Sequence, residues 1–213
     1  MRFVSVKNTS GLRDGLLQLT AGVTFYKSNV EISHSQFLHS SAEDALNIVS
    51  AQFALDDVLI DGGASDGLDV EFGVGEIVYS RFVHLGGDGL DFAGSDVQVS
   101  SSYFAHIKDK AISAGEASEI GLRDLKIERV ATGITSKDGS VTKGVNIAIL
   151  HASQDALTTY SRKTFYSTPS LTLTGVTLKE NANNFLRHKD SIMNINSQNI
   201  QASTLSDEQF YAK

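Results

Sequence analysis

A strictly spaced internal repeat constrains this chain more than any other feature of its sequence. Segment 44–48 (Asp-Ala-Leu-Asn-Ile) recurs as 66–70 and 88–92, and in weaker form as 110–114 and 132–136. The central aliphatic residues of these copies are each 22 positions apart: Leu46, Leu68, Leu90, Ile112 and Ile134. A second series has the same spacing: Leu38, Ile60, Phe82 and Phe104. A fixed period of this length indicates a solenoid, in which each turn of the chain stacks on the one before it.

The repeating units are typical of β-strands. Segments 29–32, 75–79, 96–100 and 170–174 alternate apolar and polar residues, which is the pattern of a strand with one buried side. Turn-forming Gly, Ser, Asn and Asp residues bound these segments. Pro169 is the only proline, which suits a chain whose backbone amides are needed for strand pairing. No stretch with the 3.6-residue period is long enough for a helix, so the sequence predicts an all-β solenoid.

The spacing and the alternation resemble the right-handed parallel β-helix of the pectate-lyase-like superfamily, in which each coil holds about three short strands. The resemblance covers roughly residues 15–205 and implies eight or nine coils, each as long as one repeat. Four segments look more narrowly like bacterial β-helix segments attached to spore-coat-type kinase or surface proteins: 21–26, 42–48, 109–116 and 135–140. These resemblances imply an extracellular or cell-surface location, with polysaccharide or other surface proteins as partners.

One solenoid domain is expected to account for most of the chain. Residues 1–14 are expected to form an N-terminal cap or a truncated first strand, residues 15–205 the parallel β-helix, and residues 206–213 a C-terminal tail. The repeat is interrupted over 157–169, which predicts an excursion loop, and it slips by one residue near 120, which predicts a change in turn length. A solenoid exposes strand edges at its ends. If residues 1–14 are not a cap, the chain is expected to be a fragment with additional domains.

The charge of the chain is negative and unevenly distributed. The chain has 25 acidic and 18 basic residues, a balance that argues against nucleic acid as a partner. Residues 41–100 contain twelve of the acids and a single base, Arg81. The absence of cysteine excludes disulfides, thiolate nucleophiles and Cys-ligated metals. No apolar run reaches the ~20 residues of a membrane-spanning helix, and residues 1–6 do not resemble a signal peptide, so no membrane insertion is expected.

Stacking turns two columns of the repeat into ladders of acidic side chains about 4.8 Å apart. Together they place four carboxylates on two adjacent coils: Asp66, Asp69, Asp88 and Asp91. Like charges on neighbouring strands repel each other. The cluster therefore needs a bound cation, a carboxyl that keeps its proton, or aspartates that cap backbone amides while the others face water. Ca²⁺ suits a site made only of oxygen ligands, so these four aspartates are the candidate metal ligands, and no other cofactor is expected.

A two-carboxylate glycoside hydrolase is one enzymatic interpretation of this cluster. Asp66 and Asp88 stand in Ser-Asp-Gly-Leu-Asp and Gly-Asp-Gly, which look like parts of two polygalacturonase motifs. The resemblance implies that they share the acid and water-activating roles of such an enzyme. That family next has His-Gly and then Arg-x-Lys, whereas this chain has Asp-Lys-Ala at 109–111 and Ser-Lys-Asp at 136–138. The catalytic set is therefore incomplete.

A polysaccharide lyase or C5-epimerase is the other enzymatic interpretation. It needs a base that removes the proton next to a uronate carboxylate and a group that neutralises the enolate. Lys110 is the candidate base, and Asp69 with Asp91 would hold a neutralising Ca²⁺. Without that metal, the acidic block would repel a polyuronate. Across both interpretations the candidate catalytic residues are Asp66, Asp88, Asp91 and Lys110.

The incomplete catalytic set favours a non-catalytic function. The sequence predicts a structural or carbohydrate-binding β-helix module of a cell-surface or extracellular assembly, with a polysaccharide-active enzyme as the alternative. A separate pair, His84 and His106, has the same spacing as the repeat. We expect the two imidazoles to stack as a structural pair, because their column offers a metal only Ser40, Gly62 and Glu128 as further ligands.

Overall fold

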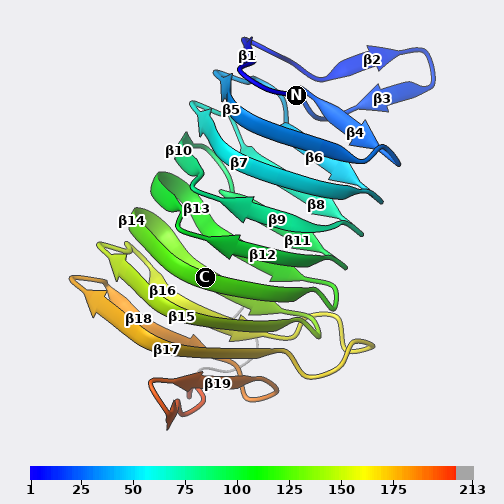
Figure 1. The fold of residues 1–213 in the computed structure, drawn as a ribbon. Helices are drawn as coiled ribbons and strands as arrows, with labels where there is room; N and C mark the ends of the chain where they lie inside the picture. Colours follow the sequence, from blue (N-terminus) through cyan, green and yellow to red (C-terminus); the bar gives the residue numbers. More distant parts are fainter. Residues whose placement is uncertain (205–213) are drawn as a thin grey trace.

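The chain folds into a solenoid of about eight turns (Figure 1). The computed structural model describes residues 1–204. Over this range strands are the only regular elements, and there is no helix that is long and apolar enough to cross a membrane. Equivalent residues on successive coils are about 22 positions apart and pair in parallel. The predicted all-β parallel β-helix is therefore confirmed.

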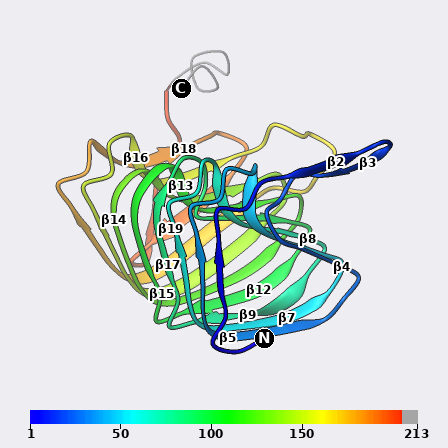
Figure 2. The ribbon, with the colours of Figure 1, turned by 90° about the horizontal axis from the view of Figure 1, so that it is seen from above.

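Three ladders of strands run along the solenoid and meet at its corners (Figure 2). Face 1 contains β4 (Thr24–Tyr26), β6 (Asp44–Val49), β8 (Asp66–Glu71), β11 (Leu90–Ala93), the ends of β13 (Tyr103–Gly115) and β14 (Glu119–Lys137), β16 (Asp155–Tyr160) and β18 (Asn183–Arg187). Face 2 contains the starts of β5 (Val30–Leu38), β7 (Gln52–Asp61), β14, β15 (Val141–Leu150) and β17 (Ser170–Lys179), with β9 (Val74–Val78), β12 (Asp96–Ser100) and β19 (Ile192–Ile195). Face 3 contains β1 (Ser5–Lys7), β10 (Arg81–Leu85), the start of β13, the middle of β14 and the ends of β5, β7, β15 and β17.

Ladders of apolar side chains fill the interior. The predicted anchors of face 1 lie in register and are fully buried, and the ladder continues one coil further than predicted: Leu46, Leu68, Leu90, Ile112, Ile134 and Leu157. On face 3, Ile60, Phe82 and Phe104 align as predicted, and the two phenyl rings stack with centroids 5.1 Å apart. The first member of that series is Phe37 and not Leu38, because the coil between Phe37 and Ile60 is one residue longer.

Each corner of a coil turns on a residue with positive φ. In one coil these residues are Phe72, Tyr79 and His84, with φ between 51° and 56°. The equivalent residues of the next coil are Gly94, Ser101 and His106. This conformation costs a non-glycine residue about 1–2 kcal/mol. Its recurrence in successive coils shows that strand pairing on both sides of the corner outweighs that cost.

Columns of buried serines satisfy backbone amides at two corners. The Ser118 hydroxyl accepts a hydrogen bond from the Ser95 N–H of the preceding coil (3.1 Å) and donates one to the Gly115 carbonyl of its own coil. At another corner, the Ser102 hydroxyl accepts from the Ser80 N–H (3.1 Å). Each serine therefore links two coils at a point where the strand ladder is interrupted.

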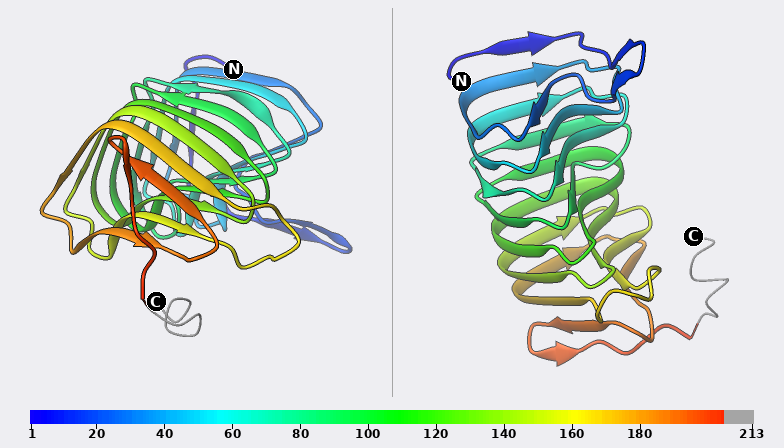
Figure 3. Two further views of the ribbon diagram at one scale, coloured as in Figure 1. Left: turned by 90° about the horizontal axis from the view of Figure 1, so that it is seen from below. Right: turned by 90° about the vertical axis from the view of Figure 1, so that its right-hand side faces the viewer.

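Both ends of the solenoid carry strands that the repeat alone does not define. Strand β1 pairs in parallel with β5, so residues 5–7 belong to the first coil. Strands β2 (Leu12–Asp14) and β3 (Leu17–Leu19) form an antiparallel hairpin that projects from the stack (Figure 3). At the other end, β20 (Gln198–Asn199) pairs antiparallel with β19. The predicted tail over 206–213 lies outside the described residues, as does residue 205.

The excursion loop is shorter than the predicted range of 157–169. Residues 157–160 belong to β16 and pair with β14 and β18, so the chain leaves face 1 only at 161. The Asp138 carboxylate accepts hydrogen bonds from the backbone N–H groups of Arg162 (2.6 Å) and Lys163 (2.8 Å). This contact fixes the start of the loop against the preceding coil.

We expect Ser118→Ala to lower the free energy of unfolding by about 1–3 kcal/mol, because the buried Ser95 N–H loses its acceptor. Denaturant unfolding followed by circular dichroism measures the change. Ser100→Ala is the control, since the Ser100 hydroxyl makes no hydrogen bond within residues 1–204, and it should change stability by less than about 0.5 kcal/mol. Equal effects of the two substitutions would mean that the serine columns do not stabilise the fold.

Candidate functional site

The outward side of face 1 carries the residues that the sequence analysis selected. Three columns of side chains run along it, one residue of each per coil. Column 1 contains Asp44, Asp66, Asp88, Lys110, Thr132 and Asp155. Column 2 contains Asn47, Asp69, Asp91, Ser113, Thr135 and Thr158. Column 3 includes Glu71, Gly115, Lys137 and Tyr160. Face 1 therefore has an acidic half on β6, β8 and β11 and a hydroxyl-rich half on β13, β14 and β16.

The aspartates of column 1 cap the backbone of the next coil. Asp66 Oδ1 accepts a hydrogen bond from the Asp88 N–H (2.7 Å), and Asp88 Oδ1 accepts one from the Lys110 N–H (2.8 Å). The Lys110 ammonium lies 3.4 Å from the same Asp88 oxygen and 2.7 Å from Asp109 Oδ2. Column 1 thus joins three successive coils through side chain–backbone hydrogen bonds.

The aspartates of column 2 are arranged as an unequal pair. Asp69 and Asp91 are direct partners across β8 and β11. Asp69 accepts a hydrogen bond from the Asn47 amide (3.1 Å), whereas Asp91 lies 3.9 Å from the Lys137 ammonium. Burial, together with the charges of Asp44 and Asp91, raises the pKa of Asp69 to about 8. A proton on Asp69 at neutral pH therefore relieves the repulsion within the pair.

Burial also shifts the titration of column 1. It raises the pKa of Asp88 to about 7 against the opposing charge of Lys110, and with the charge of Asp66 it raises the pKa of Asp44 to about 6. Burial alone would lower the pKa of Lys110, but Asp88 and Asp109 outweigh it and raise that pKa above its ordinary value. A lysine that keeps its proton is poorly suited to act as the base of a lyase.

A metal site finds no support in the geometry of the face. Within residues 1–204, no three His, Asp or Glu side chains are arranged so that they could hold a metal ion. The four candidate ligands are instead divided between backbone caps on Asp66 and Asp88 and the Asp69–Asp91 pair. The Ca²⁺ site therefore stays a prediction.

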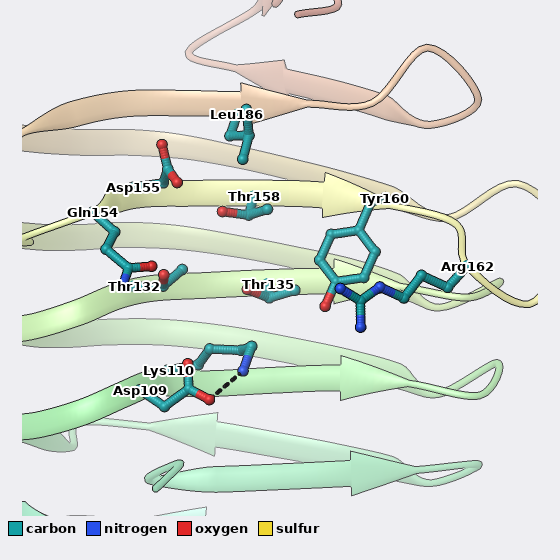
Figure 4. Close-up of a pocket in the computed structure, with 10 residues that line it drawn as sticks. All are labelled: Asp109, Lys110, Thr132, Thr135, Gln154, Asp155, Thr158, Tyr160, Arg162 and Leu186. Carbon is teal, nitrogen blue, oxygen red and sulfur yellow. Dashed lines mark hydrogen bonds and ion pairs between the residues drawn. The ribbon is translucent and has the colours of Figure 1, made fainter. Parts of the chain in front are cut away.

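A pocket of about 220 Å³ opens on the hydroxyl-rich half of face 1 (Figure 4). Thr135 and Thr158 lie on neighbouring strands at its centre, and Tyr160 lies at one end. The pocket is lined by Asp109, Lys110, Thr132, Thr135, Gln154, Asp155, Thr158, Tyr160, Arg162 and Leu186. The site thus combines hydroxyls, an aromatic ring, an aliphatic side chain and charges of both signs, which is the mixture found in small-ligand pockets.

Column 2 contains buried polar atoms that have no hydrogen-bond partner among the described residues. These atoms are the hydroxyls of Ser113, Thr135 and Thr158 and the Oδ1 atom of Asn47. Ser113 and Thr135 are 0% exposed and Thr158 is 6% exposed. An unsatisfied buried polar group costs about 1–3 kcal/mol and is rare in native proteins. Their concentration in one column indicates a place where a ligand or ordered water supplies the missing partners.

Most of column 2 is buried, although its side chains lie on the outward side of the face. Asn47 is 7% exposed, and Ser113 and Thr135 are 0% exposed. A long side chain of column 3 lies close to this part of the face: a Cβ atom at Gly115 would come within 2.7 Å of Lys137 Cε. The repeat correctly indicates which residues point outward, but not how deeply they lie.

The part of the pocket that lies on β16 does not follow from a strict count of the 22-residue repeat. Thr158 and Tyr160 fall in the range assigned to the excursion loop, because the step from Ile134 to its partner Leu157 is one residue longer than the repeat. A signal was present: Asp-Ala-Leu-Thr at 155–158 repeats the Asp-Ala-Leu-Asn of 44–47.

A β-bulge places Asp109 at the edge of the pocket. The pairing of β13 with β14 shifts between Ile107 and Lys110, so Lys108 and Asp109 together oppose a single residue of the next coil. Bulges often redirect a side chain beside a functional site. Here the bulge brings Asp109 into the pocket lining, next to the Lys110 ammonium.

We expect the protein to lose stability as the pH rises from about 5 to 8. The carboxyl of Asp69 has an ordinary pKa near 4 in the unfolded chain and a pKa of about 8 in the folded protein. Between these values the folded state binds more protons, so the free energy of unfolding falls with increasing pH. Asp69→Asn should flatten this dependence, measured as denaturation midpoints at several pH values.

The matched control is Asp96→Asn, an exposed carboxyl on β12, which should leave the pH dependence as it is in the parent protein. A parent protein that becomes more stable between pH 5 and 8 would contradict the assignment of the proton to Asp69.

Comparison with known proteins leaves the site to be interpreted from its own geometry. No protein-family model matches this chain, and no curated protein matches it. A fold alone does not determine function, so the outward side of face 1 is the basis for a functional assignment.

Proposed function

We propose that this protein is a carbohydrate-binding β-helix module that binds an uncharged, hydroxyl-rich sugar through the face 1 pocket. The observation that carries the proposal is the set of buried, unpartnered hydroxyls in column 2, two of which line that pocket. A hydroxyl both donates and accepts hydrogen bonds, as do the hydroxyls of a sugar. A change of side-chain rotamer that turns the hydroxyls of Thr135 and Thr158 toward the pocket would therefore let them pair with sugar hydroxyls in either direction.

The residues that line the pocket favour a sugar over a purely polar ligand such as an ion. Tyr160 supplies an aromatic surface and Leu186 an aliphatic one, and the threonines and Gln154 supply hydrogen-bonding groups. A sugar ring has the same division, with C–H groups on its faces and hydroxyls around its edge. Ligand pockets typically combine apolar walls with a few placed polar groups.

The charges of the pocket favour an uncharged sugar. Two carboxylates, Asp109 and Asp155, are balanced by two cations, Lys110 and Arg162. Lys110 is already paired with Asp88 and Asp109, so it offers a uronate little unneutralised charge. The neighbouring acidic half of face 1 repels polyanions at long range. Polyuronates, the substrates suggested by the pectate-lyase-like resemblance, are therefore disfavoured.

The module is proposed to work in a cell-surface or extracellular assembly. This part of the proposal extends the resemblance of the sequence to pectate-lyase-like solenoids and to spore-coat-type surface proteins. The parallel β-helix is consistent with both resemblances, and the carbohydrate chemistry of the pocket suits such a location.

A second candidate function is a polysaccharide-active enzyme, and the specific observation that favours it is the raised pKa of buried carboxyls. The raised pKa of Asp88 moves that carboxyl toward the range of a general acid, and Asp91, 3.9 Å from the Lys137 ammonium, is the second carboxyl of the pair. Because Lys110 keeps its proton, a hydrolase is favoured over a lyase.

Replacement of the pocket threonines separates binding from stability. We expect Thr135→Val and Thr158→Val to weaken sugar binding at least tenfold, because valine keeps the shape and loses the hydroxyl. The free energy of unfolding should stay the same or rise, since an unsatisfied buried hydroxyl is removed. Calorimetric titration with neutral gluco-, xylo-, manno- and chito-oligosaccharides, alongside oligogalacturonate, measures binding.

Thr172→Val, at an exposed position of β17 on face 2, is the matched control and should leave binding intact. Failure of every neutral sugar to bind, or unchanged binding by both pocket variants, would contradict the proposal.

The enzymatic alternative predicts turnover that depends on the acidic half. Incubation with the same oligosaccharides should then release reducing ends, and Asp88→Asn and Asp91→Asn should each reduce the rate by at least a hundredfold. Binding without product formation would leave the non-catalytic module as the function. Product formation that survives both substitutions would place the catalytic site elsewhere.

A further inference from the structure

We propose that a second ligand site, for a sulfate or phosphate group, lies on the corner between faces 3 and 1. We call it the basic corner. It is built from the positive-φ residues that end face 3 in successive coils, together with Lys108: His84, His106, Arg129 and His151. Neither the carbohydrate pocket nor the acidic half of face 1 uses these side chains.

The backbone of the corner brings these side chains into one line. His84, His106, Arg129 and His151 have φ between 54° and 57°. Each directly follows a residue that pairs with its equivalent in the next coil, so the four occupy the same place in successive coils. The rings of His84 and His106 stack with centroids 5.0 Å apart and an interplanar angle of 12°, which confirms the predicted pair. Beyond them opens a groove of about 670 Å³, within the usual size range of ligand sites.

The ends of the line are partly neutralised by carboxylates. The His84 ring is 2.9 Å from Asp61, and the His151 ring is 3.3 Å from Glu180. Arg129 is 3.5 Å from one oxygen of Glu128. The same glutamate also pairs with the Lys126 ammonium and accepts a hydrogen bond from the Tyr103 hydroxyl. Glu128 therefore neutralises Arg129 only in part.

The middle of the groove has side chains without a hydrogen-bond or ion-pair partner among the described residues. Within residues 1–204, neither His106 nor Lys108 has a hydrogen bond or an ion pair, and both are exposed. Together with Arg129 and His151 they line the groove, and none of the residues lining it is a carboxylate.

The β-bulge of β13 explains why the groove lacks an acid. It offsets two neighbours in sequence, so that Lys108 lines the basic groove whereas Asp109 lines the face 1 pocket. There the Asp109 carboxylate pairs with Lys110. The bulge thus keeps Lys108 from being neutralised by the residue next to it.

The donors of the groove match a tetrahedral oxyanion. Lysine and arginine only donate hydrogen bonds, and oxyanions only accept them. Arginine and phosphate or sulfate groups form particularly strong charge-assisted pairs. Because donors recur from coil to coil at about 4.8 Å, the corner can hold more than one such group. The shared chemistry is a sulfate or phosphate group, either free or as an ester on a glycan.

The test is a titration of the whole protein with inorganic phosphate, a heparin-derived hexasaccharide and its desulfated counterpart. We expect the sulfated hexasaccharide to bind, the desulfated one not to, and the affinity to fall as salt rises from 20 to 150 mM because of screening. The double substitution Lys108→Gln/Arg129→Gln should weaken binding at least tenfold. Phosphate binding of equal strength would identify a free anion as the ligand.

The control is Arg123→Gln/Lys143→Gln, which removes the same charge from exposed positions of face 2. An equal loss in the control variant, or no binding of any anionic probe, would overturn the proposal. Because all four residues are exposed, thermal denaturation should show all variants folded. Binding of neutral sugars at the face 1 pocket should be unchanged in both double variants, so the two proposals can fail independently.

Discussion

In-register pairing of parallel coils is the constraint on which the rest of this structure depends. Each residue lies about 4.8 Å from its equivalent in the next coil, so a property that recurs once per repeat becomes a line of side chains. The buried leucines of face 1, the serines that accept corner amides and the positive-φ corners all arise in this way. A coil of different length must recover the register, and the bulge between Ile107 and Lys110 does so.

Buried polar groups have hydrogen-bond partners at the corners of the solenoid, but several on the outward side of face 1 lack them within residues 1–204. At the corners, serine hydroxyls and backbone amides satisfy one another, as Ser118 does for Ser95. On the outward side of face 1, by contrast, buried hydroxyls have no partner among the described residues, and burial raises the pKa of the Asp69 carboxyl to about 8. A protein that satisfies its polar groups in one place and leaves them unsatisfied in another gives up stability locally, which is a common property of binding sites. The same ladder geometry therefore supports both the scaffold and the chemistry.

Much of the fold could be predicted from the sequence, because each coil of a solenoid packs only against the coils next to it in sequence. The length of the repeat therefore gives the register of the strands. The anchors from Leu46 to Ile134 and the His84–His106 stack follow from that period alone. The site was harder to predict. The depth of Thr135 and the burial that raises the pKa of Asp69 arise from three-dimensional packing, which the repeat does not encode. Thr158 was missed because its coil is longer than the repeat, and a single extra residue moves every later position out of a strict count.

The bulge that separates Lys108 from Asp109 has a consequence for the composition of both grooves. These neighbours in sequence belong to different grooves, one on each side of a corner, and they share a single short stretch of backbone. A single insertion or deletion in this stretch would therefore change the lining of both grooves at once.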